Sequence, residues 1–207
     1  MIPFPEHRSA AIINQSADQD TPDDPSPTPS HRRSSLTPTP NPSRQSPLKV
    51  RDIQYITGDA TAPHGSGHRI IAHICNDVGA WGKGFVVAIS KRWPEPEADY
   101  RRWYSERDKR DFALGAVRLV HVDVDISVAN MVAQRDIRRT SGSPPIRYDA
   151  LRDCLRTLAG IADSRHASVH MPRIGCGLAG GEWNEIEPII RSELSARDIQ
   201  VTVYDFP

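Results

Sequence analysis

Two glycine-rich segments carry the residue types best suited to binding an anion. The first glycine loop, residues 77–84, reads Asp-Val-Gly-Ala-Trp-Gly-Lys-Gly, and the second glycine loop, residues 174–182, reads Ile-Gly-Cys-Gly-Leu-Ala-Gly-Gly-Glu. Glycine lets backbone N–H groups turn toward a ligand, and a helix that begins after such a loop adds partial positive charge. Each hydrogen bond to a charged acceptor contributes roughly 1.5–3 kcal/mol, so a few can hold a pyrophosphate. The alternative is that both loops are only tight turns.

A second group of candidates lies just before and within the first glycine loop. His73, Asn76 and Asp77 are close in sequence, and a histidine near a carboxylate can act as a general base in phosphate-monoester hydrolysis. These three residues are therefore the candidate catalytic residues. The alternative is that His73 is a core residue whose ring nitrogens are hydrogen-bonded by its neighbours. No Cys-x-x-Cys or His-x-x-x-His spacing predicts a metal site.

The elements that must position these residues alternate along the chain after residue 50. Strands alternating with amphipathic helices predict a layered α/β domain, and roughly 155 residues are enough for one core. The nearly continuous apolar segment before the first glycine loop is typical of a strand that is covered on both faces. We expect strands at 53–57, 69–75, 117–122, 128–133, 168–171 and 201–204, and helices at 85–92, 95–107, 148–162 and 183–194.

The first 48 residues have a different composition. Ten of the 18 prolines and eight serines precede Lys49, together with a single aromatic residue, Phe4. Such a segment cannot bury enough apolar surface to offset roughly 1–2 kcal/mol of backbone entropy per residue. We therefore predict a disordered Pro/Ser/Thr-rich tail over residues 1–48 and a folded domain over residues 49–207. Recurring Thr-Pro and Ser-Pro pairs leave open a role for the tail as an adaptor ligand or a phosphorylated segment.

Charge and cysteine content exclude several classes of protein. The 26 basic and 26 acidic residues give a net charge of zero, which lacks the basic footprint of a general nucleic-acid binder. No apolar segment approaches the ~20 residues needed to cross a bilayer, so we expect no membrane insertion. Three widely spaced cysteines and the absence of a signal-like start indicate a cytoplasmic protein. We expect a monomer, because no heptad pattern or surplus apolar stripe remains.

Four motifs stand in a characteristic order along the folded part of the chain: Gly58-Asp59-Ala60-Thr61, Ala72-His73-Ile74-Cys75-Asn76-Asp77, Gly79-x-Trp81-Gly82-x-Gly84 and Pro172-Arg173-Ile174-Gly175-x-Gly177. Together they resemble the macrodomain family, the ADP-ribose-binding module. The resemblance runs from about residue 50 to the C-terminus, and it extends to the macrodomain of the ADP-ribose-activated chromatin remodeller and to the ADP-ribose-1″-phosphate phosphatase and terminal ADP-ribose glycohydrolase branches. It implies a three-layer αβα domain with a mixed, mostly parallel sheet and a cleft over the strand ends.

The resemblance also implies roles for individual residues. Asp59 matches the acid that accepts the adenine amino group, and Asn76 matches the asparagine beside the distal ribose. The two glycine loops match the phosphate-binding loops of the family, and no cofactor or metal is implied. The ligand-binding residues are then Asp59, Ala60, Asn76, Gly79, Trp81, Gly82, Gly84, Phe85, Ile174, Gly175, Cys176, Gly177 and Leu178.

Whether the domain turns over its ligand is the open question. The glycohydrolase branch uses a lysine and an aspartate where this chain has Gln134 and Ala179, and the other hydrolase branch has an aspartate near Phe85 that is missing here. The main hypothesis is binding of ADP-ribose or an ADP-ribosylated macromolecule. The alternative is a phosphatase or hydrolase that acts on ADP-ribose-1″-phosphate or related esters. A third hypothesis is an interaction protein that is recruited through its tail.

Overall fold

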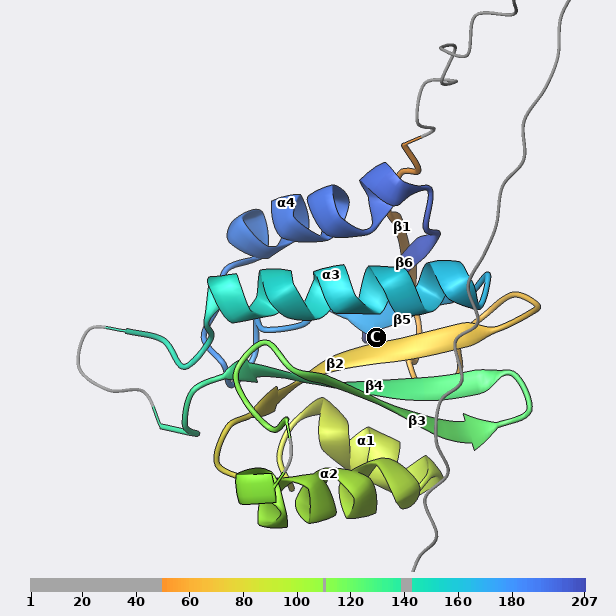
Figure 1. Ribbon diagram of the computed structural model, residues 1–207. Helices are drawn as coiled ribbons and strands as arrows, with labels where there is room; N and C mark the ends of the chain where they lie inside the picture. The colour runs from red at the N-terminus through yellow and green to blue at the C-terminus, as the bar shows by residue number, and fades with distance from the viewer. Residues whose placement is uncertain (1–49, 110, 139–142) are drawn as a thin grey trace, which may run out of the picture. The chain divides into compact units, whose positions relative to one another are not determined.

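A six-stranded sheet forms the middle layer of the computed structural model, which describes residues 50–109, 111–138 and 143–207 (Figure 1). The strand order is β1-β6-β5-β2-β4-β3, and all neighbouring strands are parallel except β3 and β4. The mixed, mostly parallel sheet is therefore confirmed, whereas the predicted tail over residues 1–48 lies outside the described residues. The strands are β1 (Gln54–Thr57), β2 (Arg69–Asn76), β3 (Val117–Asp123), β4 (Ile126–Gln134), β5 (Ser168–Pro172) and β6 (Val201–Asp205).

Two pairs of helices cover the two faces of this sheet. Helices α1 (Phe85–Arg92) and α2 (Glu95–Ser105) lie on one face, and α3 (Tyr148–Ser164) and α4 (Trp183–Glu193) lie on the other (Figure 1). This arrangement confirms the three-layer α/β fold. The second helix ends at Ser105 rather than at residue 107, because the chain leaves the α conformation at Glu106 before a short 3₁₀ turn.

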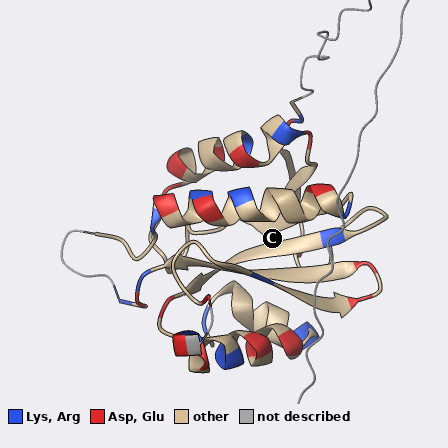
Figure 2. Ribbon diagram, viewed as in Figure 1, with Lys and Arg blue, Asp and Glu red and all other residues tan. Residues whose placement is uncertain are grey.

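Burial follows the position of each strand in the sheet. The central strand β2 is almost entirely buried, and β4 is buried from Ile126 to Ala133, whereas the short edge strand β1 is mostly exposed. Side chains of β2 alternate between the two faces: Ile70 packs toward α3 and α4, and Ile71 packs toward α1. Charged side chains gather on the helices and loops, and the middle of the sheet carries few of them (Figure 2). Among the described residues, no helix is both long and apolar enough to cross a bilayer.

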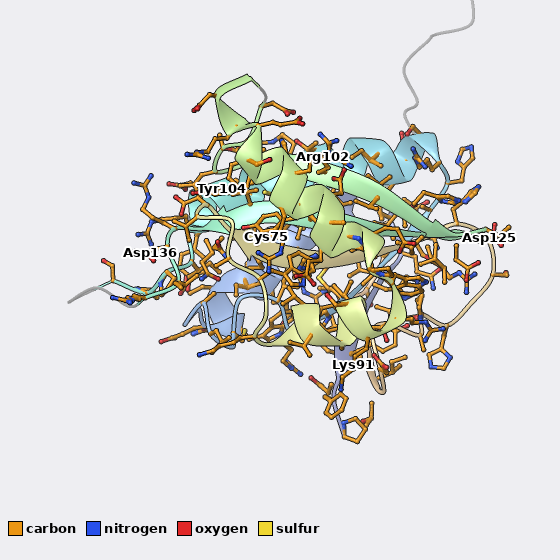
Figure 3. All side chains as sticks on the ribbon, turned by 90° about the horizontal axis from the view of Figure 1, so that it is seen from below. Cys75, Lys91, Arg102, Tyr104, Asp125 and Asp136 are labelled. Carbon is orange, nitrogen blue, oxygen red and sulfur yellow. The ribbon has the colours of Figure 1, made fainter. Side chains whose placement is uncertain are left out.

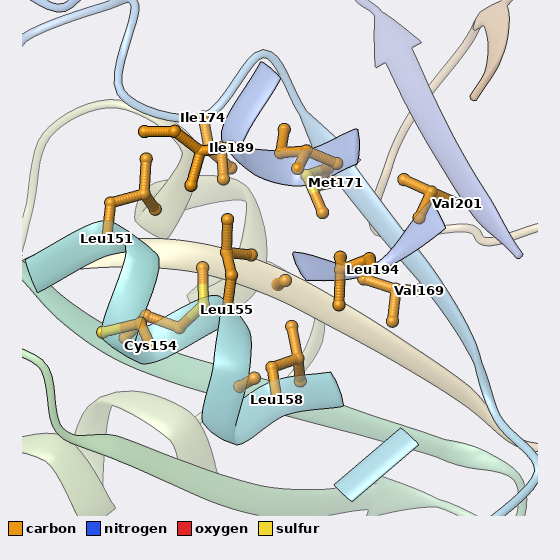
Figure 4. Close-up of a cluster of buried hydrophobic side chains, with 14 of the residues drawn as sticks. Leu151, Cys154, Leu155, Leu158, Val169, Met171, Ile174, Ile189, Leu194 and Val201 are labelled. Carbon is orange, nitrogen blue, oxygen red and sulfur yellow. The ribbon is translucent and has the colours of Figure 1, made fainter. Parts of the chain in front are cut away.

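The larger part of the core lies between the sheet and the pair α3 and α4. Leu151, Leu155 and Leu158 recur at helical spacing along α3 and have no exposed surface. They face side chains such as Val169 and Met171 of β5 (Figure 4). Since this cluster also includes Ile186 and Ile189 of α4, it holds the carboxyl end of β5 and the start of α4 in place.

Truncation of Leu155 tests this cluster. We expect Leu155→Ala to lower the free energy of unfolding by about 2–5 kcal/mol, because it opens a cavity in a fully buried site. Leu178→Ala makes the same chemical change where the side chain is 65% exposed, and it should change stability by less than about 0.5 kcal/mol. Urea denaturation of the two variants measures the difference, and equal effects would contradict the packing described here.

Candidate functional site

A cavity of about 550 Å³ lies where three parallel strands end. Asn76 at the end of β2, Gln134 at the end of β4 and Pro172 at the end of β5 all line it. Parallel pairing brings the carboxyl ends of these strands to one edge, which is where ligands bind in open α/β sheets. Ten of the sequence-predicted residues line this cavity: His73, Asn76, Trp81, Gly82, Gly84, Phe85, Ile174, Gly175, Gly177 and Leu178.

The first glycine loop leads directly into α1. Gly82 (φ 136°) and Gly84 (φ 79°) adopt backbone conformations that residues with a side chain rarely reach. Gly84 is the N-cap of α1, and no side chain caps this helix. The N–H groups of the first turn, at Phe85 and Val86, therefore stand at the cavity with the positive end of the helix dipole behind them.

The second glycine loop is tightly packed at one end and open in the middle. A Cβ atom on Gly175 would lie 2.6 Å from Ile146 Cδ1 and 2.9 Å from Ile186 Cδ1, and the residue has φ 77°. A Cβ on Gly177 would meet no atom within 4 Å, and its φ is not positive. Packing therefore requires a glycine at position 175. At position 177 the space next to the backbone is empty, so packing does not require a glycine there. From Gly175 to Gly180 the loop also spells Gly-x-Gly-x-x-Gly between a strand and a helix, as dinucleotide-binding loops do.

Asn76 shapes the first glycine loop from within. Its Oδ1 accepts hydrogen bonds from the N–H groups of Val78 (3.1 Å) and Ala80 (2.9 Å), and its Nδ2 donates to the carbonyl of Ala80 (2.6 Å). The Tyr100 hydroxyl donates to the Asn76 carbonyl (2.7 Å). The side chain lines the cavity with much of its hydrogen-bonding capacity already used, so contact with a distal ribose stays a prediction.

Asp77 holds a neighbouring segment and is not among the residues that line the cavity. Its Oδ1 accepts a hydrogen bond from the N–H of Asp136 (2.7 Å), and its own N–H donates to the carbonyl of Gln134 (2.8 Å). These contacts join the end of β2 to the turn after β4. A catalytic role for Asp77 stays a prediction, and the structure adds a positioning role for its carboxylate.

His73 lines the cavity but is almost completely buried. Its Nε2 lies 2.6 Å from Oδ1 of Asn130, whose Nδ2 donates to the carbonyl of Pro96. The amide oxygen can only accept, so Nε2 of His73 carries the proton. Burial lowers the pKa of His73 to about 4. The ring is therefore neutral at pH 7 and a weaker base than a free histidine, which favours the interpretation as a core residue over the one as a general base.

Trp81 packs against other aromatic rings and also lines the cavity. Its ring meets His73 edge-on at 5.4 Å between centroids and lies 5.3 Å from the ring of Tyr100. Its indole Nε1 donates to Oγ of Ser90 (2.8 Å). The same side chain lines the cavity, so its packing is compatible with the predicted ligand contact.

Four other predicted ligand residues do not line this cavity: Asp59, Ala60, Gly79 and Cys176. Asp59 follows β1, and its Oδ1 accepts hydrogen bonds from the N–H and the hydroxyl of Thr61, both at 2.8 Å. Gly79 has φ 70°, and a Cβ there would overlap the ring of Tyr104, so packing alone requires this glycine. Ala60 is buried, and burial raises the pKa of the Cys176 thiol.

Two basic residues at the cavity were not predicted as ligand contacts. Arg173 donates two hydrogen bonds to the carboxylate of Asp205 (2.5 and 2.9 Å), and its guanidinium lies over the rings of Tyr55 and Trp183. Lys83 is exposed and makes no ion pair within the described part of the chain. Lysine between two glycines of a phosphate-binding pattern was the signal that would have identified it.

The residues at the glycohydrolase positions also lie at the cavity. Gln134 donates from Nε2 to the carbonyl of Asp136 (2.7 Å), and Ala179 is buried. Across the described residues, no three His, Cys, Asp or Glu side chains gather in a way that could hold a metal. The buried His170 of β5 is hydrogen-bonded to Ser168 and Tyr204.

A sheet between two helical layers, with a glycine-lined cavity at the ends of parallel strands, defines an α/β domain of the kind in which ligands bind at the carboxyl ends of the strands. No protein-family model matches the chain. A solved macrodomain protein from Streptomyces coelicolor is 51% identical, with a TM-score of 0.68 over 74% of this chain and 99% of that one. The chain therefore belongs to the macrodomain family.

Sequence relatives add two further similarities. The chromodomain-helicase-DNA-binding protein 1-like of Mus musculus is 36% identical over 77% of this chain, which spans only 18% of the length of that relative. The ADP-ribose 1″-phosphate phosphatase of Lodderomyces elongisporus is 26% identical over 74% of this chain and 99% of its own length.

The buried histidine predicts how stability depends on pH. Between the ordinary histidine pKa of 6.5 and the lowered value of about 4, the unfolded chain binds a proton at residue 73 and the folded domain does not. The free energy of unfolding therefore falls as the pH falls through this window, by about 1.4 kcal/mol per pH unit for each such histidine. His170, whose pKa burial also lowers to about 4, adds a second proton.

Urea denaturation between pH 7 and pH 4.5 measures this slope. We expect His73→Gln to reduce the slope by about one proton, and His121→Gln, at an exposed position on β3, to leave it unchanged. Equal slopes in all three proteins would contradict a buried, neutral His73.

Proposed function

We propose that this domain binds ADP-ribose, free or attached to a macromolecule, in the cavity at the ends of β2, β4 and β5. One observation carries the proposal: both glycine loops, from distant parts of the sequence, line the same cavity. Its volume of about 550 Å³ lies within the range of small-molecule sites, about 300–1,000 Å³. The phosphatase relative from Lodderomyces elongisporus is named for an ADP-ribose ester, which supports the choice of ligand.

The pyrophosphate of ADP-ribose matches the donors at this cavity. Backbone N–H groups of the two glycine loops and the uncapped first turn of α1 offer hydrogen bonds to phosphate oxygens. Lys83 adds a positive charge at the rim, whereas the charge of Arg173 is already paired with Asp205. Phosphate binding therefore rests on the backbone, with Lys83 as the supplementary cation.

Asp59 does not line the cavity, but β1 ends at the same edge of the sheet as β2, β4 and β5, and Asp59 is the proposed contact to adenine there. The carboxylate follows β1, and its two hydrogen bonds from Thr61 fix its orientation. Oxygen lone pairs remain on this carboxylate to accept a hydrogen bond from the exocyclic amine of adenine. A carboxylate at this position favours adenine over guanine, which presents a carbonyl oxygen there.

Hydrolysis of ADP-ribose-1″-phosphate or a related ester is the second candidate function. It is supported by the phosphatase relative, which this chain covers over 99% of its length. His73 would be the base, but its Nε2 is bound to Asn130 and its pKa is lowered by burial to about 4. We therefore rank binding above turnover. Release of inorganic phosphate from ADP-ribose-1″-phosphate, lost in His73→Ala, would reverse this order.

We also propose that the protein is a cytoplasmic monomer with no general affinity for nucleic acid. The three cysteines are free thiols, and two of them, Cys75 and Cys154, are buried, which suits a reducing compartment. The net charge of zero supports the absence of general nucleic-acid binding.

Calorimetric titration with ADP-ribose, with AMP as control ligand, tests the binding proposal. We expect micromolar affinity for ADP-ribose and much weaker affinity for AMP, which lacks the second phosphate and the distal ribose. Gly177→Leu should weaken ADP-ribose binding about tenfold or more without lowering the melting temperature, because a Cβ there meets no protein atom and only a ligand would clash. Gly177→Leu that binds as the wild type does would place the ligand elsewhere.

Replacement of Asp59 tests the adenine contact separately. We expect Asp59→Ala to weaken ADP-ribose binding by roughly 1–3 kcal/mol, since a hydrogen bond to a charged acceptor is lost. Asp163→Ala removes an exposed carboxylate near the end of α3 and should leave affinity unchanged. Unchanged affinity in Asp59→Ala would contradict the proposed role of this carboxylate.

A further inference from the structure

Four residues of the loop and of the two adjacent helices form a closed circuit of hydrogen bonds, which we call the Trp81 clamp: Trp81, Ser90, Glu97 and Arg101. Nε1 of Trp81 donates to Oγ of Ser90 (2.8 Å), and this hydroxyl donates to Oε2 of Glu97 (2.8 Å). Arg101 closes the circuit, because its Nε donates to Oε1 of Glu97 (2.9 Å) and its Nη2 to the carbonyl of Trp81 (3.3 Å).

The Trp81 clamp ties the first glycine loop to both helices on its face of the sheet. Ser90 belongs to α1, and Glu97 and Arg101 lie one turn apart on α2. The two helices lie together over this face of the sheet (Figure 3). The clamp therefore fixes the side chain and the carbonyl of Trp81 relative to two rigid elements.

The loop needs this anchor because its remaining residues offer few others. Gly82 has no side chain, and an added Cβ there would meet nothing within 4 Å; Lys83 is exposed. Asn76 holds the loop only as far as Ala80, and the next described backbone hydrogen bond is from the N–H of Val87 to the carbonyl of Gly84. Between these points, the contacts of Trp81 hold the segment that lines the cavity.

Glu97 stays ionised at the centre of the circuit. Its hydrogen bond from Ser90, followed by the contact with Arg101, lowers the pKa of this carboxyl group. As an anion it accepts one hydrogen bond at each of its two oxygens, whereas an amide of the same shape has only one accepting atom at these two positions. The orientation of Ser90 is thereby fixed: its proton points to Glu97 and its lone pair receives the indole N–H.

We propose that Ser90, Glu97 and Arg101 are positioning residues for ligand binding, which hold Trp81 and the first glycine loop in the conformation that receives the phosphates and distal ribose of ADP-ribose. None of the three lines the cavity, so they act through Trp81 and not by contact with the ligand. The proposal rests on the proposed function and deepens it, because it assigns part of the affinity to residues outside the site.

The experiment compares ADP-ribose binding by the full chain and four variants. Ser90→Ala removes two links of the clamp, and Glu97→Gln keeps the shape of the side chain but removes its charge. Both should raise the Kd for ADP-ribose about tenfold. Ser90→Thr restores the hydroxyl and should recover most of the affinity. Glu95→Gln makes the same acid-to-amide change on α2 at an exposed position without a described contact, and it should bind as the wild type does.

The indole N–H resonance of Trp81, assigned by its loss in Trp81→Phe, reports the state of the clamp directly. We expect ADP-ribose to shift it in the wild type, and Ser90→Ala and Glu97→Gln to shift it before any ligand is added. Melting temperatures of all variants show whether an affinity change follows from loss of folded protein.

The outcomes separate the two proposals. A wild-type chain that does not bind ADP-ribose overturns the proposed function and the clamp with it. A wild type that binds, with Ser90→Ala and Glu97→Gln binding equally well, overturns the clamp alone. Weaker binding that tracks the loss of folded protein, with Ser90→Thr no better than Ser90→Ala, also overturns the clamp.

Discussion

The parallel pairing of β2 with β4 and β5 is the constraint on which the rest of this domain depends. Parallel neighbours end at the same edge, so the segments that follow all three strands must meet there. Parallel pairing also requires crossovers, and the helices of these crossovers cover both faces of the sheet. The parallel direction of these strands therefore accounts for the position of the cavity, for the meeting of the glycine loops and for the burial of the central strands.

The glycines at this edge serve different physical purposes. Gly175 is held against Ile146 and Ile186, where a side chain has no room, and Gly84 takes a backbone conformation that suits glycine at the start of α1. Gly177 meets neither requirement. Neither packing nor backbone conformation requires a glycine at position 177. A ligand that approaches the backbone at the cavity wall is therefore the most direct explanation for this residue.

The layered fold could be predicted from sequence because its signals are local. A nearly continuous apolar segment over residues 69–75 marks a strand covered on both faces, and apolar residues at helical spacing over residues 148–162 mark a helix with one buried face. The hydrogen-bonding partners of the site could not be predicted in this way. Arg173 is hydrogen-bonded to the carboxylate of Asp205, 32 positions later in the chain, and His73 is hydrogen-bonded to the amide of Asn130, 57 positions later. Residue type indicates which groups can bind a ligand, whereas tertiary packing decides which are still free to do so.

The first strand of the chain, β1, pairs only with the last strand, β6. β1 pairs with β6 from Gln54 opposite Thr202 to Thr57 opposite Asp205, and the N–H of Gly58 continues the ladder to the carbonyl of Asp205. During synthesis on the ribosome, β1 must therefore wait unpaired until almost the whole domain has emerged. Asp59, which follows it directly, takes its place only then, so a nascent chain that has already packed its helices still lacks the carboxylate that we propose as the contact to adenine.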